Sequence, residues 1–436
     1  MNTVSKNMVV VPVVEQHAED ATVCALRRRF ALDAGHLDLT RLSRLDELLI
    51  AHVDGLRVAG DAGLEIAFAA MSADVSGSGF APVMLSLERE DKTRLQRILT
   101  LFSAAGRLQS EVAPAFCWMV AMGQLEPEDI LDSTPTPEQI CLLFRALGPR
   151  HRDRYGIVQD GLSHANSTVR AEAAQAAGRL GLVDLTDRMR AGFTDPDPEA
   201  RFWFSWAAVL LGHRGPGLEV LVGFMSTSGP LCRTAWLLGG PALDVARATS
   251  LLKELALQPG AQRQLIAAVG SVGRSGYVSW LIRQMSDPAL ARCAGEAFSL
   301  ITGLDLAMLD LDRAPPEDEG ATPNENAADD RVDMDSDDGL PWPAPAAIGS
   351  WWQANEHRYP ADRPFFLGMA PSQSQCLEVL ADGYQRQRRA AAVWWSLLRP
   401  GTPLFPVDAP VALQRGWIER ALASGELAPR TDGGSR

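Results

Sequence analysis

Five arginines recur at a nearly constant spacing in the middle of the chain, and their side chains could bind anions. They are Arg170, Arg201, Arg233, Arg263 and Arg292, separated by 31, 32, 30 and 29 residues. A guanidinium group binds carboxylates and phosphates through paired N–H donors, so such an array could bind an acidic peptide or another anion. The alternative is structural, with each arginine bonded to an aspartate or a loop carbonyl of a neighbouring repeat. Asp195 and Asp287 lie just upstream of two of the arginines and favour the structural interpretation.

Two pairs of adjacent tryptophans are the second group of residues that could bind a partner. Trp351 is followed by Trp352, and Trp394 is followed by Trp395. Neighbouring residues on a helix point in different directions and cannot both face one core. We therefore expect one member of each pair to be exposed or to meet a second surface. All four are candidates for contacts with a protein partner.

Residues for catalysis or metal binding form no recognisable pattern in the sequence. The seven histidines include no HExxH motif, and the six cysteines include no CxxC pair. No serine is framed as GxSxG, and no Walker loop is present. We predict that the protein is not an enzyme and has no catalytic residues, no cofactor and no metal site. The cysteines are expected to be reduced and buried.

A helical repeat of about 30 residues must position the arginines. Asn166, Asp197 and Asp287 precede the expected repeat helices as N-caps. Glycines are expected to end these helices, at Gly181, Gly212, Gly239-Gly240, Gly273 and Gly303. Almost no strand pattern occurs anywhere in the chain. We predict an all-α fold, with a HEAT-like α-solenoid of antiparallel helix pairs over residues 126–312.

Residues 1–125 are predicted to form an N-terminal helical region. We expect helices near 14–31, 42–56 and 64–71, and shorter ones near 81–89, 92–104 and 110–122. In the second of these, Leu42, Leu49 and Val53 share one apolar face, and Asp46 is expected on the other side. Thr136-Pro137-Glu138-Gln139 has the pattern of a capping box and predicts the start of another helix.

The repeat array is followed by an acidic segment, residues 313–346. Ten acids lie between Arg313 and Leu340, against two arginines. Such a segment buries too little apolar surface to offset the entropy of ordering, so we predict a disordered linker. An alternative is an acidic peptide that mimics nucleic acid or plugs the groove of the array. Residues 347–436 are predicted to form a tryptophan-rich helical module that caps the array, with one long helix from Cys376 to Leu398.

The formal net charge of −13 limits the partners that the chain can bind. An acidic surface repels phosphate backbones, so we expect no nucleic acid. No apolar run approaches the roughly 20 residues that a membrane helix needs, so we expect no membrane insertion. The protein is therefore expected in the cytoplasm.

Two resemblances extend this interpretation. Three segments resemble short HEAT repeats of the phycobilisome-lyase-like type, namely Asn166–Gly181, Asp195–Gly212 and Asp287–Gly303. At whole-chain level, the sequence resembles an uncharacterised family of bacterial HEAT-repeat proteins encoded near type VI secretion genes. The residues that carry this second resemblance are Glu15–Asp20, Arg44-Leu45-Asp46, His52, Asp54-Gly55-Leu56, Ala59-Gly60, Trp351-Trp352 and Gln385–Ala392.

The family resemblance implies a role beside PAAR-like spike-tip proteins, and it supplies no catalytic residues. We therefore expect a non-enzymatic scaffold or adaptor, an accessory factor that binds a spike-tip protein or a secreted effector. One alternative is an immunity protein that neutralises a toxin. A HEAT-like nucleic-acid-binding protein or DNA glycosylase is another, and the acidic charge disfavours it.

Overall fold

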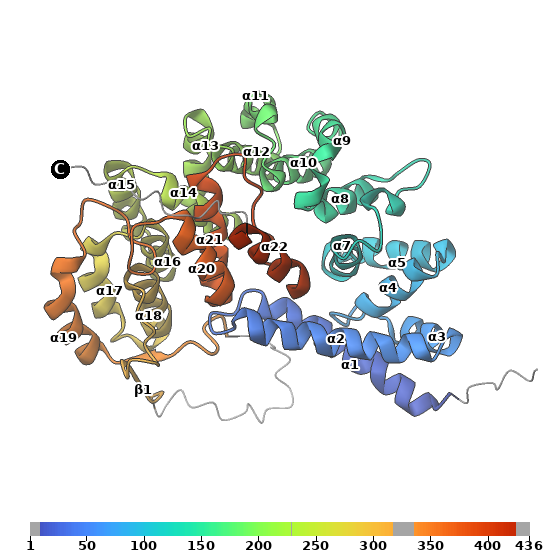
Figure 1. Ribbon diagram of the computed structural model, residues 1–436. Helices are drawn as coiled ribbons and strands as arrows, with labels where there is room; N and C mark the ends of the chain where they lie inside the picture. Colours follow the sequence, from blue (N-terminus) through green and yellow to red (C-terminus); the bar gives the residue numbers. More distant parts are fainter. Residues whose placement is uncertain (1–8, 228, 317–334, 424–436) are drawn as a thin grey trace, which may run out of the picture. The chain divides into compact units, whose positions relative to one another are not determined.

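The computed structural model describes residues 9–227, 229–316 and 335–423, and these residues form an all-α protein (Figure 1). Within those ranges there are 22 α-helices joined by loops and 3-10 turns. The strands there are β1 (Asp312–Arg313) and β2 (Trp342–Pro343), which pair antiparallel. The predicted all-α class is confirmed.

The chain divides into two compact units, and each is assembled from separate stretches of sequence. Unit 1 comprises Met1–Asp33, Leu37–Leu180 and Pro406–Glu426. Among the described residues, unit 2 comprises those of Ala34–His36 and Gly181–Phe405. These boundaries differ from the four predicted segments, because residues 126–180 of the expected array belong to unit 1 and residues 181–312 to unit 2.

Unit 1 is built mainly from helices that pack against near neighbours in the sequence. Among others, α1 packs against α2, α4 against α7, and α8 against both α7 and α10, whereas α22 packs against the distant α2. The helices of unit 1 are α1 (Val11–Ala31), α2 (Leu39–Val58), α3 (Asp61–Ala70), α4 (Phe80–Glu88), α5 (Lys92–Ala104), α6 (Leu108–Glu111), α7 (Ala113–Ala121), α8 (Pro137–Ala146), α9 (Tyr155–Gly161), α10 (Ser167–Leu180) and α22 (Val411–Ala423), with the 3-10 turns η1 (Pro127–Ile130) and η2 (Pro149–Arg154).

The apolar face predicted for α2 is present, but the placement of Asp46 was wrong. Leu42, Leu49 and Val53 are fully buried as expected. Asp46 is also buried, on the same face, because residues 42, 46, 49 and 53 follow helical spacing. Its carboxylate accepts hydrogen bonds from Arg28 Nε at 2.6 Å and from the Val411 amide at 2.7 Å. The periodicity of α2 alone could not show this, because the second donor lies at the far end of the chain.

Unit 2 contains a row of four helices, each packed against the next: α12 (Pro198–Leu210), α14 (Pro230–Ala242), α16 (Gln262–Val272) and α18 (Pro288–Thr302). Three helices alternate with them in sequence and pack against members of the row, namely α13 (Pro216–Met225), α15 (Val245–Ala256) and α17 (Val278–Gln284). Consecutive helices thus pack as pairs (Figure 1). The remaining elements are η3 (Val183–Leu185), α11 (Thr186–Met189), η4 (Arg190–Thr194), η5 (Ser275–Tyr277), α19 (Pro345–Asn355), η7 (Glu356–Arg358), α20 (Gln373–Asp382) and α21 (Gln385–Leu398).

Most of the predicted helix ends are confirmed. Asp197 accepts the Ala200 amide at 2.9 Å, and Asp287 accepts the Ala289 amide at 3.0 Å, as N-caps do. The capping box of Thr136 and Gln139 is formed at the start of α8. Four of the predicted terminal glycines have positive φ, namely Gly181, Gly212, Gly273 and Gly303.

The predicted helix end at Gly239-Gly240 was wrong. Both residues lie inside α14. A Cβ atom at Gly239 would overlap the Met225 side chain, so this glycine lets α13 and α14 approach closely. The expected single helix from Cys376 to Leu398 was also wrong, because it is broken into α20 and α21 at Gly383.

The carbonyl groups at the ends of two row helices are bonded by a later stretch of unit 2, residues 359–368. The Phe365 amide donates to Gly273 O at 2.7 Å, at the end of α16. The Leu367 and Gly368 amides donate to Leu300 O and Ile301 O at 2.7 and 3.0 Å, at the end of α18. A helix end leaves its last carbonyls without helical partners, and this stretch supplies donors for them. The C-terminal ends of α16 and α18 therefore hold a non-helical segment of the same chain.

Two further predictions concern membranes and the acidic linker. In the described part of the chain, no helix combines the length and apolarity needed to cross a membrane. Of the predicted linker 313–346, residues 317–334 lie outside the described residues. Its two ends are described, and they include β1, β2 and a turn at Asp335–Gly339.

His151 in η2 should make unit 1 less stable in mild acid. Its side chain is buried, and its Nδ1 accepts the Gly148 amide at 3.0 Å. Burial, and next the nearby Arg150 charge, lower the pKa of His151 from the ordinary 6.5. Because the folded pKa lies below the unfolded one, the full stability is present above about pH 6.5 and is lost as the pH falls below it.

We therefore expect the melting temperature of the wild type to fall between about pH 7.5 and 5.5 by more than that of His151→Gln. Thermal melts of both proteins at several pH values measure this difference. The idea fails if the two proteins lose stability equally over this range.

Candidate partner-binding surface

Two arginines of the predicted series make the same local contacts. Arg170 Nη1 donates to His164 O and Ala165 O at 2.8 and 2.9 Å. Arg201 Nη1 donates to Asp195 O and Pro196 O at 2.5 and 3.1 Å. In both cases the acceptors are the carbonyls six and five residues upstream, in the loop that leads into the helix. These contacts match the structural interpretation of the series, although the bonded loop belongs to the arginine's own repeat.

In unit 2, Arg201, Arg233, Arg263 and Arg292 form what we call the arginine row. Each lies within the first five residues of its helix, in α12, α14, α16 and α18 respectively. A helix N-terminus carries a partial positive charge, so a cation there is unfavourable for the helix itself. The row therefore places guanidinium groups beside the positive ends of the helices, an arrangement that attracts anions.

The anions that meet the row come from the chain itself, in a segment that we call the acidic turn (Asp335–Gly339). Arg292 Nη2 contacts Asp335 Oδ2 at 2.6 Å, and Arg292 Nη1 donates to Asp337 O at 3.1 Å. Arg263 forms an ion pair with the Asp337 carboxylate and donates to Ser336 Oγ at 2.9 Å. Arg263 also donates to Ala289 O at 3.1 Å, which links α16 to the start of α18.

The acidic turn is folded tightly around these contacts. The Asp338 amide donates to Asp335 O, and the Leu340 amide to Asp337 O, both at 3.0 Å. Asp337 is 4% exposed, whereas the side chain of Asp335 is 52% exposed. Burial alone would raise the pKa of Asp335, but hydrogen bonds from the Asp337 amide and from Arg292 keep that pKa below its usual value. Asp335 is thus held as a carboxylate at the outer edge of the contact.

Sequence reasoning missed one arginine of this surface, Arg386 in α21. Its Nη1 contacts Glu296 Oε2 at 2.7 Å, and its Nη2 donates to Ser336 O. Burial raises the pKa of Glu296, and Arg386 opposes that rise. Arg386 lies in the basic run Gln385–Arg389 that the sequence makes visible, but its distance from the 30-residue series hid its place beside Arg263 and Arg292.

One face of Arg292 stacks on an aromatic ring. Its Cζ lies 4.8 Å from the centre of the Trp342 ring, in β2. Its Nε has no hydrogen-bond partner among the described residues, although the atom is buried. Arg292 therefore has a stacked face, two bonded edges and one N–H group that the acidic turn does not use.

All four tryptophans proposed as partner contacts lie in unit 2, and three of them are buried. Trp394 and Trp395 in α21 are both buried, since α21 packs against α20 on one side and against α12 and α14 on another. The expected second surface is thus provided by the protein itself. Trp352 is buried against Tyr359, with ring centres 5.4 Å apart. Trp351 is half-buried and contacts Phe298 and Tyr359.

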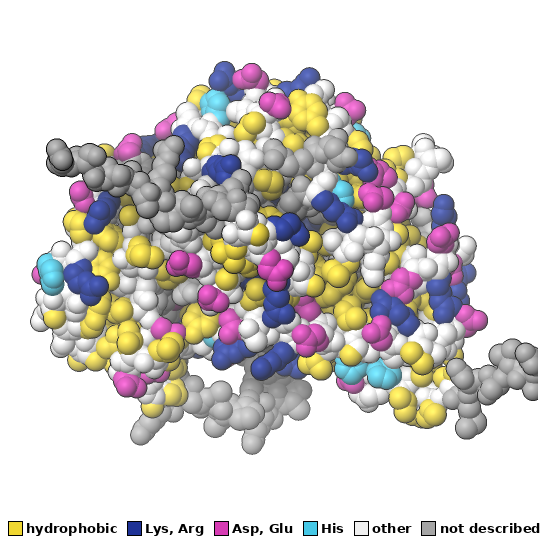
Figure 2. Space-filling view, viewed as in Figure 1, with side chains coloured by type: hydrophobic (Ala, Val, Ile, Leu, Met, Phe, Trp, Pro, Cys, Tyr) yellow, Lys and Arg dark blue, Asp and Glu magenta, His cyan; other side chains and the backbone are white. Residues whose placement is uncertain are grey.

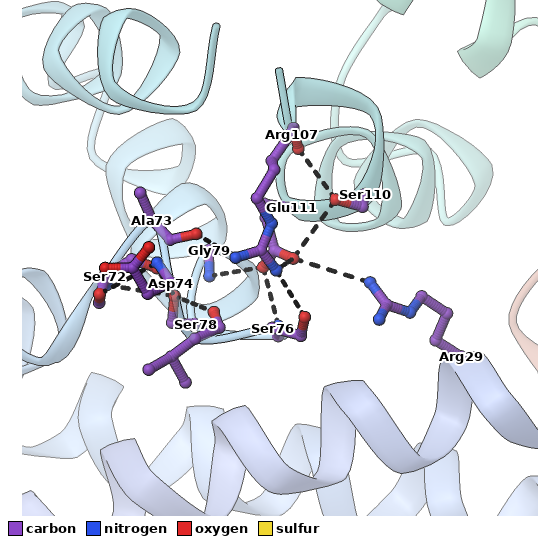
Figure 3. A network of polar contacts seen from close by, with 12 residues as sticks. Arg29, Ser72, Ala73, Asp74, Ser76, Ser78, Gly79, Arg107, Ser110 and Glu111 are labelled. Atoms are coloured by element: carbon purple, nitrogen blue, oxygen red, sulfur yellow. Dashed lines mark hydrogen bonds and ion pairs between the residues drawn. The ribbon is translucent and has the colours of Figure 1, made fainter. Parts of the chain in front are cut away.

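Unit 1 has its own polar network, centred on the fully buried carboxylate of Glu111 in α6 (Figure 3). Glu111 Oε2 accepts the Gly77 amide at 2.8 Å, and Oε1 accepts from Arg107 at 2.8 Å. Arg29 of α1 lies 3.7 Å from the same carboxylate. The network holds the loop Ser72–Gly79 in place, so we interpret it as structural.

A pair of histidines joins α1 to α2. His17 Nδ1 lies 3.2 Å from His52 Nδ1, and Asp20 Oδ2 lies 3.7 Å from His52 Nδ1. A Cβ at Gly55 would meet the His17 ring, so the glycine makes room for it. Within the described ranges, no group of three or more His, Cys, Asp or Glu side chains is arranged to hold a metal ion.

The cysteines are expected to be unreactive while the protein is folded. All six are free, and burial raises the pKa of Cys141 and Cys376 to about 12 and that of Cys232 and Cys293 to about 11. Since the thiolate is the reactive form, a thiol reagent at about pH 8 should label these four at less than roughly a hundredth of their rate in denaturant. Native labelling of any of the four at the denatured rate would contradict this prediction.

Comparisons with family models, with curated proteins and with solved structures each gave no match. The arginine row and the acidic turn must therefore be understood from their own contacts. On the face shown in Figure 2, Lys and Arg side chains are interspersed with Asp and Glu.

Proposed function

We propose that the protein is a non-enzymatic scaffold that binds a protein partner, and that its paired helices form a HEAT-like α-solenoid. The sequential packing of α12 to α18 supports this proposal. So do the elements that α10, α12 and α18 share: an aspartate or asparagine cap, an arginine near the start of the helix, and a glycine with positive φ just after its end. Proteins of this architecture commonly present an extended surface to other proteins.

One observation supports the binding role most strongly. Both ends of the row helices hold other parts of the chain: the acidic turn lies on the arginines at the N-terminal ends, and residues 359–368 bond to carbonyls at the C-terminal ends of α16 and α18. Exposed guanidinium and carbonyl groups at helix ends can bind an incoming peptide by the same kinds of hydrogen bond. Within unit 2, two segments of the chain are thus bound at helix ends in the way that a partner peptide could be bound.

We further propose that the partner is a component of type VI secretion, a PAAR-like spike-tip protein or a secreted effector, with the chain acting as its accessory factor in the cytoplasm. The support is the resemblance at Glu15–Asp20, Arg44–Leu56 and Gln385–Ala392. In the structure, three residues of these motifs have structural roles, because Asp46 bonds Arg28 and His17 contacts His52. Arg386, from the third motif, lies on the candidate surface.

The test is a deletion of the gene, with the secretion of a spike-tip protein or effector encoded beside it as the readout. Loss of that secretion, restored by the wild-type gene, together with co-purification of the two proteins, is the expected result. Unchanged secretion in the deletion strain would refute the accessory role. Rescue of cells from a co-expressed toxin without any effect on secretion would instead identify an immunity protein.

A further inference from the structure

We infer that the surface formed by Arg263, Arg292 and Arg386 is a binding site for a carboxylate-rich peptide segment of a partner, and that the chain's own acidic turn occupies it in the partner's absence. This inference names the partner chemistry within the proposed scaffold function and rests on that function. Unlike the proposed cellular function, the peptide site can be tested with the purified protein and a peptide alone.

Two arginines near the starts of row helices make different kinds of contact. Arg201, at the first turn of α12, uses its guanidinium on its own loop carbonyls Asp195 O and Pro196 O. Arg292, near the start of α18, contacts Asp335 and the Asp337 carbonyl instead. An arginine near the start of a row helix therefore serves its own repeat in α12 and binds an acidic segment from outside the row in α18.

The three arginines bind the acidic turn through groups that any acidic peptide carries. Its side chains are bonded at Asp335, Ser336 and Asp337, and its backbone carbonyls are bonded at Ser336 and Asp337. Carboxylate side chains and backbone carbonyls are present in any acidic peptide. A partner segment with aspartates two residues apart could make the same contacts.

The acidic turn does not use all the hydrogen-bonding capacity of Arg292, so a partner segment could bind it more tightly. The outer pair, Arg292 with Asp335, involves a carboxylate that is about half exposed, and exposed ion pairs are weak. Arg292 Nε is buried and has no partner in the described part of the chain. A partner carboxylate that reached this N–H would gain a charge-assisted hydrogen bond that the acidic turn does not make. A partner segment that makes this additional hydrogen bond would therefore compete favourably with the acidic turn.

The test measures binding of one defined probe to the full chain. The probe is a fluorescent peptide with the sequence of residues 332–341, Val-Asp-Met-Asp-Ser-Asp-Asp-Gly-Leu-Pro. Its control is the same peptide with every aspartate replaced by asparagine. Three proteins are compared. They are the wild type, the double variant Asp335→Asn/Asp337→Asn, and a triple variant that also carries Arg292→Ala. The double variant weakens the contacts of the acidic turn with the arginines. Arg201→Ala in that variant is the matched control, because Arg201 bonds its own loop.

We expect the Asp335→Asn/Asp337→Asn protein to bind the acidic peptide at least about tenfold more tightly than the wild type, with affinity falling as salt rises. Adding Arg292→Ala should abolish binding, and adding Arg201→Ala should leave it within about twofold. If the peptide fails to bind the opened variant at low salt, or binds regardless of Arg292, the inference is wrong.

Asp337 is buried, so its replacement could unfold unit 2. Asp335→Lys is the second variant, because it changes only the half-exposed outer carboxylate, and it should also raise peptide affinity while the helical circular dichroism and melting temperature stay as in the wild type. Unchanged peptide affinity in a folded Asp335→Lys protein would overturn the inference. Peptide binding that follows this pattern without any effect of the gene on secretion would refute the proposed cellular role and leave the peptide site standing.

Discussion

Replacing Asp46 by alanine is expected to destabilise unit 1 by about 3–5 kcal/mol, the largest effect that we predict for a single polar residue. The change removes the carboxylate that bonds Arg28 Nε and the Val411 amide, both at buried positions. Arg28 would keep its bonds to Asp408 O and Ala409 O, each 3.1 Å long, and its position over the Trp118 ring, but its charge would be buried without a counter-ion.

Urea unfolding measures the loss of stability, and limited proteolysis reports whether α22 separates from α2. Asp54→Ala in the same helix is the matched control, since Asp54 is exposed and pairs with Arg57 at the surface. It should cost less than about 1 kcal/mol. In the double variant Arg28→Ala/Asp46→Ala, part of the loss should be recovered because no unpaired charge remains. A loss for Asp46→Ala no larger than that for Asp54→Ala would show that the buried pair does not stabilise the unit.

Gly303→Ala should strongly destabilise unit 2 at the end of α18. Gly303 has φ +76, and a Cβ there would lie 2.5 Å from Leu367 O. The variant thus combines the strain of a left-handed alanine, about 1 kcal/mol, with a forced shift of the backbone that bonds to Leu300 O and Ile301 O. Losing those two hydrogen bonds adds about 1–3 kcal/mol, for a total of about 2–4 kcal/mol.

Gly260 provides a direct control, because it has φ +75 and nothing lies within 4 Å of its added Cβ. Gly260→Ala should show the backbone strain alone, about 1 kcal/mol. The difference between the two variants in thermal or urea unfolding isolates the contact with residues 365–368. Equal losses would mean that this segment does not depend on the close approach at Gly303.

The sequence predicted the features of the fold that are local. The helix class follows from periodicity, and the N-caps Thr136, Asp197 and Asp287 are read within three residues of the groups that they bond. The glycine ends at Gly273 and Gly303 follow from backbone conformation. Gly239 shows the limit of this reasoning, because the same residue type can end a helix or admit a neighbouring side chain, and only the neighbour decides which.

The features that sequence reasoning missed all depend on distant partners. Asp46 looked solvent-facing because its donors are Arg28 and Val411, and Arg386 looked like part of a basic helix because its acceptors are Glu296 and Ser336. At Arg170 and Arg201 the arginines bond carbonyls of their own loops, whereas the structural interpretation had named a neighbouring repeat. Arg263 and Arg292 of the same series face the acidic turn, which composition alone had assigned to a linker. Composition shows that a segment is acidic, but the fold decides which cations that segment contacts.

The membership of α22 in unit 1 has a consequence for how the protein is made. A ribosome delivers α22 long after α1 and α2, so Asp46 and Arg28 lack their partners from residues 408–411 throughout the synthesis of the intervening chain. Unit 1 therefore cannot close while it is being translated, and a nascent chain that stalls near residue 400 should be open to proteases and to chaperones.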